Sequence, residues 1–327
     1  MLGEIIAILA VLTFVGSNVI FRKTEHVASP TFINFFRTAV GTLTFILLVF
    51  IINQLNLILI IPWELWLVLI LSFLFGQVIG DTAYFSAQKE LGTTIALAIS
   101  MTFPLFTFIL SLIFLNRPFR INLILSLILI GVGITIIGKS KIGSENSDEN
   151  GNNSTQQSIK LRIGEIFRKN KVKAIVFCLT ASLGWAVGAV MIEFATDKID
   201  KIIPAKELSS IIANVIRFPF ALLILGSMVW RENYLKKEHN SLSKQKKNLR
   251  VWILLLSASI IGTSLGSYLY TESIHIADSD VVALIASASP LFALPLTYLI
   301  NKETISLFGF IGVILTICGV VVILIKN

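Results

Sequence analysis

The stretch "GQVIGDTAYFSAQKELGTTIALAISMTFPLF" (Gly76–Phe106) aligns without a gap with "GTSLGSYLYTESIHIADSDVVALIASASPLF" (Gly262–Phe292), 186 residues further along the chain. Two glycines, one tyrosine and the closing Pro-Leu-Phe recur at matching positions. At a shift of 180 residues, the pair Asn34 and Arg37 likewise coincides with the pair Asn214 and Arg217. The chain therefore contains an internal repeat, and the architecture of one half predicts that of the other.

The composition indicates a membrane protein. Of the 327 residues, 55% are hydrophobic and only 14% are charged, and the mean hydropathy is +0.85. A soluble domain contains about 25% charged residues, so the apolar excess points to contact with lipid. The net charge of +8 lies mainly in loops between apolar runs, which is typical of membrane orientation signals and argues against a nucleic-acid partner. Cys178 and Cys318 lie in separate apolar runs, so no disulfide, metal site or other cofactor is expected.

A helix needs about 20 mostly apolar residues to cross a bilayer, and the sequence contains ten such runs. We therefore predict an all-α integral membrane protein with ten transmembrane helices. Each half would hold five helices, an odd number, so the second repeat would be inverted relative to the first. The predicted runs are 2–21, 31–52, 65–86, 92–115, 121–138, 173–193, 208–230, 251–273, 280–300 and 305–325.

The two halves are predicted as residues 1–138 and 173–327, joined by a polar linker at 139–172 that contains "GSENSDENGNNSTQQS". A low apolar content is typical of a flexible segment. The loops on the linker's side of the membrane hold 19 Lys and Arg residues, against 6 on the other side. Positive-inside bias then places the linker in the cytoplasm and both termini outside, in a multi-pass protein of the cell membrane.

Inverted repeats are the architecture of many secondary transporters, because two similar halves can exchange conformations and so alternate access to a central site. The sequence therefore predicts a secondary transporter of a small molecule in the lipid bilayer. The alternatives are a membrane-embedded enzyme, a scaffold without transport, and a channel. The chain has no Walker A, HExxH or GxSxG sequence, which argues against ATP coupling and against two common classes of hydrolase.

The sequence also resembles the EamA-type members of the drug/metabolite transporter superfamily over essentially its whole length. The resemblance rests on the two five-span units, on "VGSNVIFRK" (Val15–Lys23), on the arginine of the second and seventh runs, and on "INKE" (Ile300–Glu303). It implies carrier-mediated movement of small metabolites, often the export of amino acids or related compounds. One position departs from the family pattern, because the fourth run ends at Arg117 where the resemblance implies a glutamate like Glu303.

Arg37 and Asp81 are predicted to lie at matching depths in the membrane. Arg37 is about 10 Å past Pro30, and Asp81 is about 12 Å before Lys89, at a rise of about 1.5 Å per residue. A charged residue inside a span is expensive unless it is paired or faces a polar cavity. We expect these two residues either to form a structural ion pair or to contact substrate together with Asn34. In a third interpretation, Arg37 extends to the lipid headgroups.

Several polar and aromatic residues are further candidates for a central site. Tyr84 shares a helical face with Asp81, and Tyr270 repeats that face in the eighth run, with Ser267 in the position of the aspartate. The tyrosine hydroxyls are expected to meet either a ligand or a backbone carbonyl. Trp185 is the one tryptophan away from a span end, where it either packs or lines a cavity. Protons and a counter-solute both stay open as coupling partners, and no sequence signal fixes the oligomeric state.

Pro104 and Pro290 are predicted in the middle of spans. Each leaves the carbonyl four residues earlier, that of Ser100 or Ala286, without its helical partner. We expect hinges for alternating access at these prolines, with static kinks as the alternative. His275 lies near a span end, and we expect a solvated loop histidine there rather than a proton relay.

Arg217 is the main candidate for substrate binding. It lies about 13.5 Å along its helix from Leu208, which is near the middle of a hydrocarbon layer of about 30 Å. Ser267 cannot neutralise it, and Glu193 and Glu272 lie nearer to span ends. Arg217, with Asn214 one turn earlier, is therefore expected to bind the anionic group of an amino acid, organic acid or phosphorylated metabolite. The alternative is a pairing with an acid elsewhere in the chain.

Overall fold

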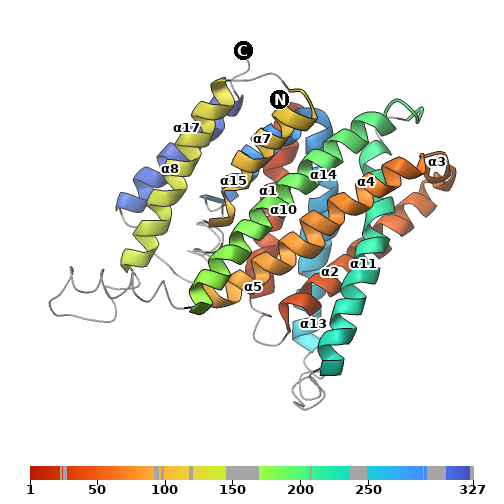
Figure 1. Ribbon diagram of the computed structural model, residues 1–327, viewed down its shortest axis with the longest axis horizontal. Helices are drawn as coiled ribbons and strands as arrows, with labels where there is room; N and C mark the ends of the chain where they lie inside the picture. Colours follow the sequence, from red (N-terminus) through yellow and green to blue (C-terminus); the bar gives the residue numbers. More distant parts are fainter. Residues whose placement is uncertain are drawn as a thin grey trace.

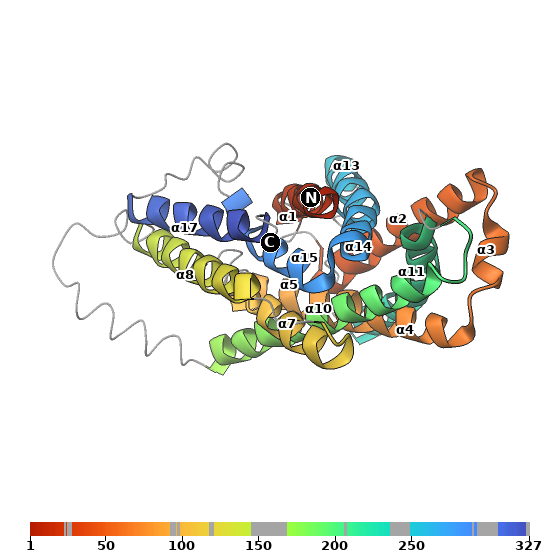
Figure 2. The same ribbon diagram turned by 90° about the horizontal axis from the view of Figure 1, so that it is seen from above.

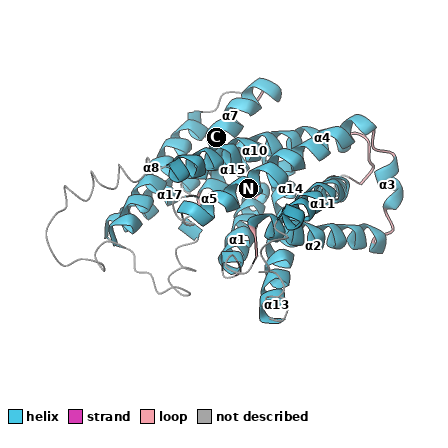
Figure 3. Ribbon diagram, turned by 60° about the horizontal axis from the view of Figure 1, so that its bottom comes forward, coloured by secondary structure: helices cyan, strands magenta, loops and turns pink. Residues whose placement is uncertain are grey.

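The computed structural model describes residues 1–22, 24, 28–91, 96, 99–117, 121–144, 169–205, 208–235, 249–289, 291–292 and 307–324. Within these ranges all regular secondary structure is helical, as Figure 3 shows. The prediction of an all-α protein is therefore confirmed for the described part of the chain. The helices of the first half are α1 (Leu2–Arg22), α2 (Pro30–Ile51), α3 (Leu55–Leu59), α4 (Trp63–Phe73), η1 (Leu74–Asp81), α5 (Thr82–Leu91), α7 (Phe103–Phe114) and α8 (Ile121–Ser144).

The second half begins with a long helix and follows the same order. Its helices are α10 (Lys169–Ile199), α11 (Ser209–Leu235), α13 (Leu249–Ala258), η3 (Ser259–Leu265), α14 (Gly266–Ala277), α15 (Ser279–Ser287) and α17 (Leu307–Leu324). Both ends of the predicted linker are helical, because α8 continues to Ser144 and α10 begins at Lys169. The linker residues 145–168 lie outside the described part of the chain.

Six helical segments in the described residues are long and apolar enough to cross a membrane. They are Leu2–Phe21, Pro30–Ile51, Trp63–Glu90, Val172–Ile199, Ser209–Glu232 and Leu249–Ala277, and shorter apolar helices cover Phe103–Phe114 and Ile121–Gly133. Several of these helices extend past the predicted apolar runs, since a polar residue alone does not end a helix. Parts of the predicted runs 92–115 and 280–300 lie outside the described residues.

Large apolar side chains cover the outer faces of the helices. Such an apolar surface would aggregate in water but matches a hydrocarbon environment. The inner faces form a packed core in which Phe218 contacts Phe45 at 4.9 Å and Phe73 at 4.4 Å between ring centroids. Exposed examples on six different helices are Leu9, Leu43, Ile113, Ile128, Leu223 and Ile253.

The third and eighth predicted spans each contain a π-helix. The segment α4–η1–α5 is continuous, and so is α13–η3–α14. η1 begins at Leu74 and η3 at Ser259, which are matching places to within one residue at the 186-residue shift of the repeat. π-Helical turns inside α-helices are frequently found at functional sites, so these two segments draw attention to the residues around them.

Close backbone contact holds the third span against α10. A Cβ atom at Gly184 would lie 2.5 Å from the Phe75 carbonyl oxygen, and one at Gly188 would lie 2.8 Å from that of Ser72. The glycines allow the two helices to approach closely, which drives helix association in lipid. In the eighth span, Gly266, which matches Gly80 of the third, packs against Thr13 of α1.

The helices form a main bundle and a separate pair. In Figures 1 and 2, α8 and α17 lie side by side at one edge of the molecule, apart from the helices around α10. Both helices contact the bundle mainly through α15. The charged and polar candidate residues lie in the main bundle, on α2, η1, α5, α10, α11 and α14.

Candidate functional site

Arg217 lies on α11 with only 2% of its surface exposed. Its Nε donates to Asn214 Oδ1 at 2.9 Å, and its Nη2 donates to Thr271 Oγ1 at 2.8 Å. Its guanidinium carbon also lies 4.8 Å from the centre of the Phe73 ring. All of these contacts are neutral, and no acid among the described residues forms an ion pair with Arg217. A guanidinium this deeply buried is normally paired.

Asn214 and Thr271 complete a polar cluster around this arginine. Thr271 Oγ1 is 3.3 Å from Asn214 Oδ1 and donates to the Ser267 carbonyl at 2.9 Å. Asn214 Nδ2 is buried and has no hydrogen-bond partner among the described residues. The structure therefore brings Arg217, Asn214 and Ser267 into one cluster, although Ser267 contributes its backbone and not its hydroxyl. Thr271 was missed by the sequence reasoning, and only its position one helical turn after Ser267 could have indicated it.

Arg37 and Asp81 form the ion pair that their matched depths predict, through Arg37 Nη2 and Asp81 Oδ2. Trp185 of α10 donates its Nε1 to the other carboxylate oxygen, Asp81 Oδ1, at 2.8 Å. The guanidinium carbon of Arg37 lies 5.3 Å from the centre of the Phe85 ring. Asp81 is therefore held from two sides, by helices of both halves of the chain. Trp185 has a polar contact that neither interpretation of its role had included.

Asn34 does not repeat the role of Asn214. Its Nδ2 donates to the Gln77 carbonyl at 2.8 Å and to Thr82 Oγ1 at 3.0 Å, so it ties α2 to the π-helix η1. Gln77 returns a hydrogen bond from Nε2 to Thr38 Oγ1 at 2.7 Å. Asn214 instead bonds the arginine of its own helix. The two Asn-x-x-Arg motifs thus have different surroundings despite their matching positions.

The two repeat-related tyrosines each contact an aromatic ring of the first helix of one half. Tyr84 lies 5.4 Å from Trp185 of α10, and Tyr270 lies 5.8 Å from Phe14 of α1, between ring centroids. Tyr270 also interacts electrostatically with both Arg217 and Asp81. Tyr270 is therefore near a charged group of each half, Asp81 of the first and Arg217 of the second.

Pro104 does not lie inside a continuous helix, contrary to the prediction. The chain turns at Met101 and Thr102, and Pro104 is in the first turn of α7, where its missing N–H costs no hydrogen bond. The Ser100 carbonyl that was expected to lack a partner accepts a hydrogen bond from Ser182 Oγ of α10 at 2.9 Å. In the second half, α15 ends at Ser287, and the Ala286 carbonyl accepts a hydrogen bond from Ser289 Oγ. Pro290 lies outside the described residues.

His275 is not a solvated loop residue, contrary to expectation. Its side chain is only 12% exposed, and its Nε2 lies 2.6 Å from Asp200 Oδ2. Glu272 lies 4.0 Å from the other ring nitrogen. Within the described residues Glu272 forms no ion pair with Arg217, in line with its predicted place near a span end. No group of His, Cys, Asp and Glu residues in the described ranges has the arrangement of a metal site.

Comparison with known proteins decides the family. The sequence model described as the EamA-like transporter family matches residues 1–139 and 172–325. The chain belongs to the EamA-like transporter family. It is therefore a multi-pass integral membrane protein of a transporter family, as the resemblance in the sequence implied.

Two further comparisons extend along the whole EamA chain. A protein of Archaeoglobus fulgidus named as an uncharacterized transporter is 25% identical over 326 residues, which cover 99% of this chain and 98% of that protein. A crystal structure described only as that of a protein has a TM-score of 0.68 at 15% identity, covering 98% of this chain and 95% of the other. That likeness shows a shared fold.

Proposed function

We propose that this EamA protein is a secondary transporter of a small anionic or zwitterionic metabolite, and that Arg217 binds the anionic group of the substrate. The observation that carries the proposal is the contact set of Arg217: a buried guanidinium whose partners are all neutral. Burying a charge is costly unless a counter-ion accompanies it. A substrate carboxylate or phosphate would supply that counter-ion, and the planar guanidinium suits two-point contact with either group.

The proposed transport mechanism is alternating access between two inverted five-helix repeats, residues 1–138 and 173–327. Three pairs of features at matching positions support it. These are the two π-helices, the helix breaks at Met101–Thr102 and Ala288, and the aromatic contacts of Tyr84 and Tyr270. Broken helices are common where transporters bend or bind their substrates. Hinges at these breaks are part of the proposal.

The other assigned residues have supporting roles in this proposal. In this proposal Asp81, held by Arg37 and Trp185, and Tyr270, which lies near both Asp81 and Arg217, contact the opposite end of a zwitterionic molecule. Asn34 positions η1 beside them. We further propose that both termini face outward from the cell membrane, on the strength of the Lys and Arg distribution between the loops. Protons and a counter-solute are both compatible as coupling partners.

The binding test uses purified protein and a set of carboxylates, amino acids and phosphorylated compounds in a thermal-shift screen. A ligand at 100 times its Kd stabilises a protein by about 2.7 kcal/mol, so a specific ligand should raise the melting temperature measurably. Arg217→Lys keeps the charge but loses the planar fork, and it should weaken binding of that compound roughly tenfold or more while the protein stays folded. Arg217→Gln should abolish the shift.

Arg231→Lys is the matched control, because Arg231 lies on the same helix and is exposed. It should bind the compound as the wild type does. Wild-type affinity in Arg217→Gln would rule out the assigned site. Counterflow in proteoliposomes then separates a carrier from a channel, since substrate on the far side accelerates uptake only through a carrier.

A further inference from the structure

Arg117 lies just after the end of α7, in the first half of the chain. Asn116 before it has a positive φ of 51°, a left-handed conformation that is common where helices end. The guanidinium Nε donates to Glu193 Oε1 at 2.8 Å, and Nη2 also contacts that oxygen. The same Nη2 lies 2.8 Å from Asp278 Oδ1 and 3.9 Å from Asp197 Oδ2. One arginine of the first half therefore meets three carboxylates of the second.

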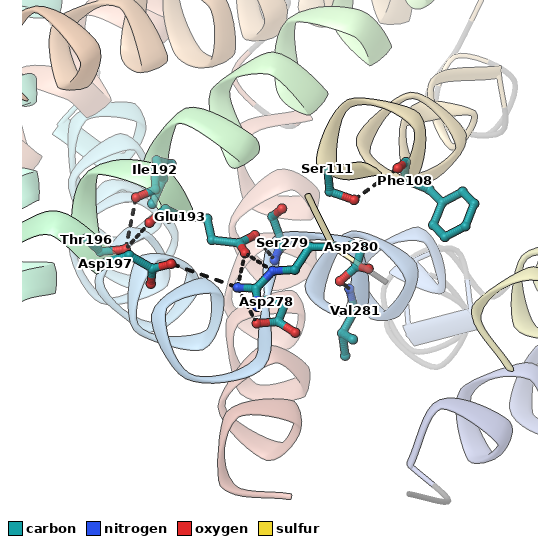
Figure 4. Close-up of polar contacts among 11 residues, drawn as sticks. Phe108, Ser111, Ile192, Glu193, Thr196, Asp197, Asp278, Ser279, Asp280 and Val281 are labelled. Atoms are coloured by element: carbon teal, nitrogen blue, oxygen red, sulfur yellow. Dashed lines mark hydrogen bonds and ion pairs between the residues drawn. The ribbon is translucent and has the colours of Figure 1, made fainter. Parts of the chain in front are cut away.

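Two of these acceptors, Glu193 and Asp278, are held by the backbone around the turn between α14 and α15. Glu193 of α10 is 1% exposed, and its second oxygen accepts a hydrogen bond from the Ser279 backbone N–H at 2.7 Å (Figure 4). Asp278 joins α14 to α15 with a φ of 71°. Partial burial acts against the charge of Arg117, but the hydrogen bond and charge of Glu193, with the charges of Asp278 and Asp197, outweigh it and raise the pKa of Arg117. The guanidinium thus stays charged at physiological pH.

These contacts lie at the end of the bundle where the chain begins. Gly3 of α1 packs against Ala277, next to Asp278. We call this the outer end, in line with the orientation proposed above. The ion pairs connect α7, which belongs to the first half, to α10 and to the turn between α14 and α15, which belong to the second half. Any motion that separates the two halves at the outer end must break them.

The Arg117 side chain is 29% exposed while Glu193 is 1% exposed. Breaking the contact would therefore return the arginine to water but leave the glutamate without its counter-ion unless water entered beside it. An uncompensated buried charge is strongly unfavourable. The paired state and a hydrated open state are consequently separated as two discrete arrangements, which is what a gate requires.

We propose that Arg117 is the latch of an outer gate: its ion pairs with Glu193 and Asp278 hold the outer end closed, and their rupture with entry of water opens it. The inference rests on the proposed function, because a gate has a role only in a protein with alternating access. It adds a named residue that controls the distribution between conformations.

The test measures the distance across the outer end without any substrate. Spin labels are placed on cysteines at Phe114 of α7 and Lys198 of α10, both exposed, after the native Cys178 and Cys318 are replaced by alanine and serine. Double electron–electron resonance should give one main, short distance. Arg117→Gln should add a longer population and raise the ratio of open to closed molecules roughly tenfold or more, which corresponds to about 1.4 kcal/mol.

A double variant tests the latch without leaving a buried charge that could prevent folding. Arg117→Gln combined with Glu193→Gln leaves no lone buried carboxylate, so it should fold and should also populate the longer distance. Lys201→Gln, an exposed outer-end change, is the control and should leave the distances unchanged. A wild-type distribution in the Gln/Gln variant would overturn the latch.

The two proposals can fail separately. If the distances respond as expected but Arg217→Gln still binds the identified compound, the latch stands and the substrate site is wrong. If Arg217 governs binding but the Gln/Gln variant stays closed, the substrate site stands and the latch is wrong.

Discussion

At the scale of single residues, two arginines at matching positions of the repeat have different electrostatic environments. Arg37 meets Asp81, while Arg217 meets the neutral side chains of Asn214 and Thr271. The difference follows from one substitution in the repeat, since Ser267 replaces the aspartate. A protein that used both arginines only for structure would gain nothing by leaving one without a counter-ion.

The Arg37–Asp81 pair can be tested by a double-mutant cycle. Arg37→Ala or Asp81→Ala leaves a buried charge alone and should destabilise the protein by about 3–5 kcal/mol, whereas the double variant should cost less than the sum of the two. Thermal unfolding of the purified protein is the measurement. Arg231→Ala, at an exposed position, should change stability by less than about 0.5 kcal/mol. Strictly additive losses would show that the contact carries no coupling.

Some of these contacts could be predicted from the sequence and others could not. The regular rise of a helix fixed the depths of Arg37 and Asp81, so their pairing was predictable. Glu193 and Arg117 are separated by 76 residues, and their contact depends on the left-handed turn at Asn116, which no sequence pattern signalled. The prediction for His275 was wrong because its partner Asp200 lies 75 residues earlier in the chain, beyond the reach of local sequence patterns.

At the scale of helices, the break before Pro104 is stabilised by a side chain of another helix. Ser182 Oγ donates to the Ser100 carbonyl and lies 2.7 Å from Thr102 Oγ1. The sequence showed correctly that the Ser100 carbonyl loses its helical partner, but it could not show that α10 supplies a replacement. The two π-helices were also unpredictable, because the apolar pattern hardly changes between α- and π-helical turns.

Ser182→Ala should therefore destabilise the conformation in which the fourth span is broken before Pro104. The change leaves a buried carbonyl without its donor, and we expect a loss of about 1–3 kcal/mol in the free energy of unfolding. Ser227→Ala is the matched control, because the Ser227 hydroxyl bonds its own helix at an exposed position. Equal melting temperatures for the two variants would mean that Ser182 does not support the break.

At the scale of the whole molecule, the proposed orientation in the membrane rests on the distribution of charge alone. The loops on the side of the 139–172 linker carry 19 Lys and Arg residues, and the loops on the other side carry 6. This asymmetry could be predicted from the sequence because it depends only on how many Lys and Arg residues each loop holds, and not on how the helices pack. The packing of α8 and α17 as a separate pair was not, since their apolar faces would suit any neighbouring helix equally well.

A reporter enzyme that is active only in the cytoplasm checks this orientation. Inserted within 139–172, it should be active, and fused after Asn327, it should be inactive, because positive loops are retained inside. Membrane fractionation must show comparable amounts of both fusions. Activity only in the C-terminal fusion would reverse the outer end defined above, and the Arg117 gate would then face the cytoplasm.

The hydrogen bond from Trp185 to Asp81 has an optical consequence. Indole emission depends on the charges and dipoles near the ring, and Trp185 has a carboxylate at its N–H and packs against Tyr84 and Phe103. The other four tryptophans, Trp63, Trp66, Trp230 and Trp252, lie near the ends of α4, α11 and α13. A rearrangement of Asp81 would therefore shift the emission wavelength of Trp185, and this shift can be measured without an added label.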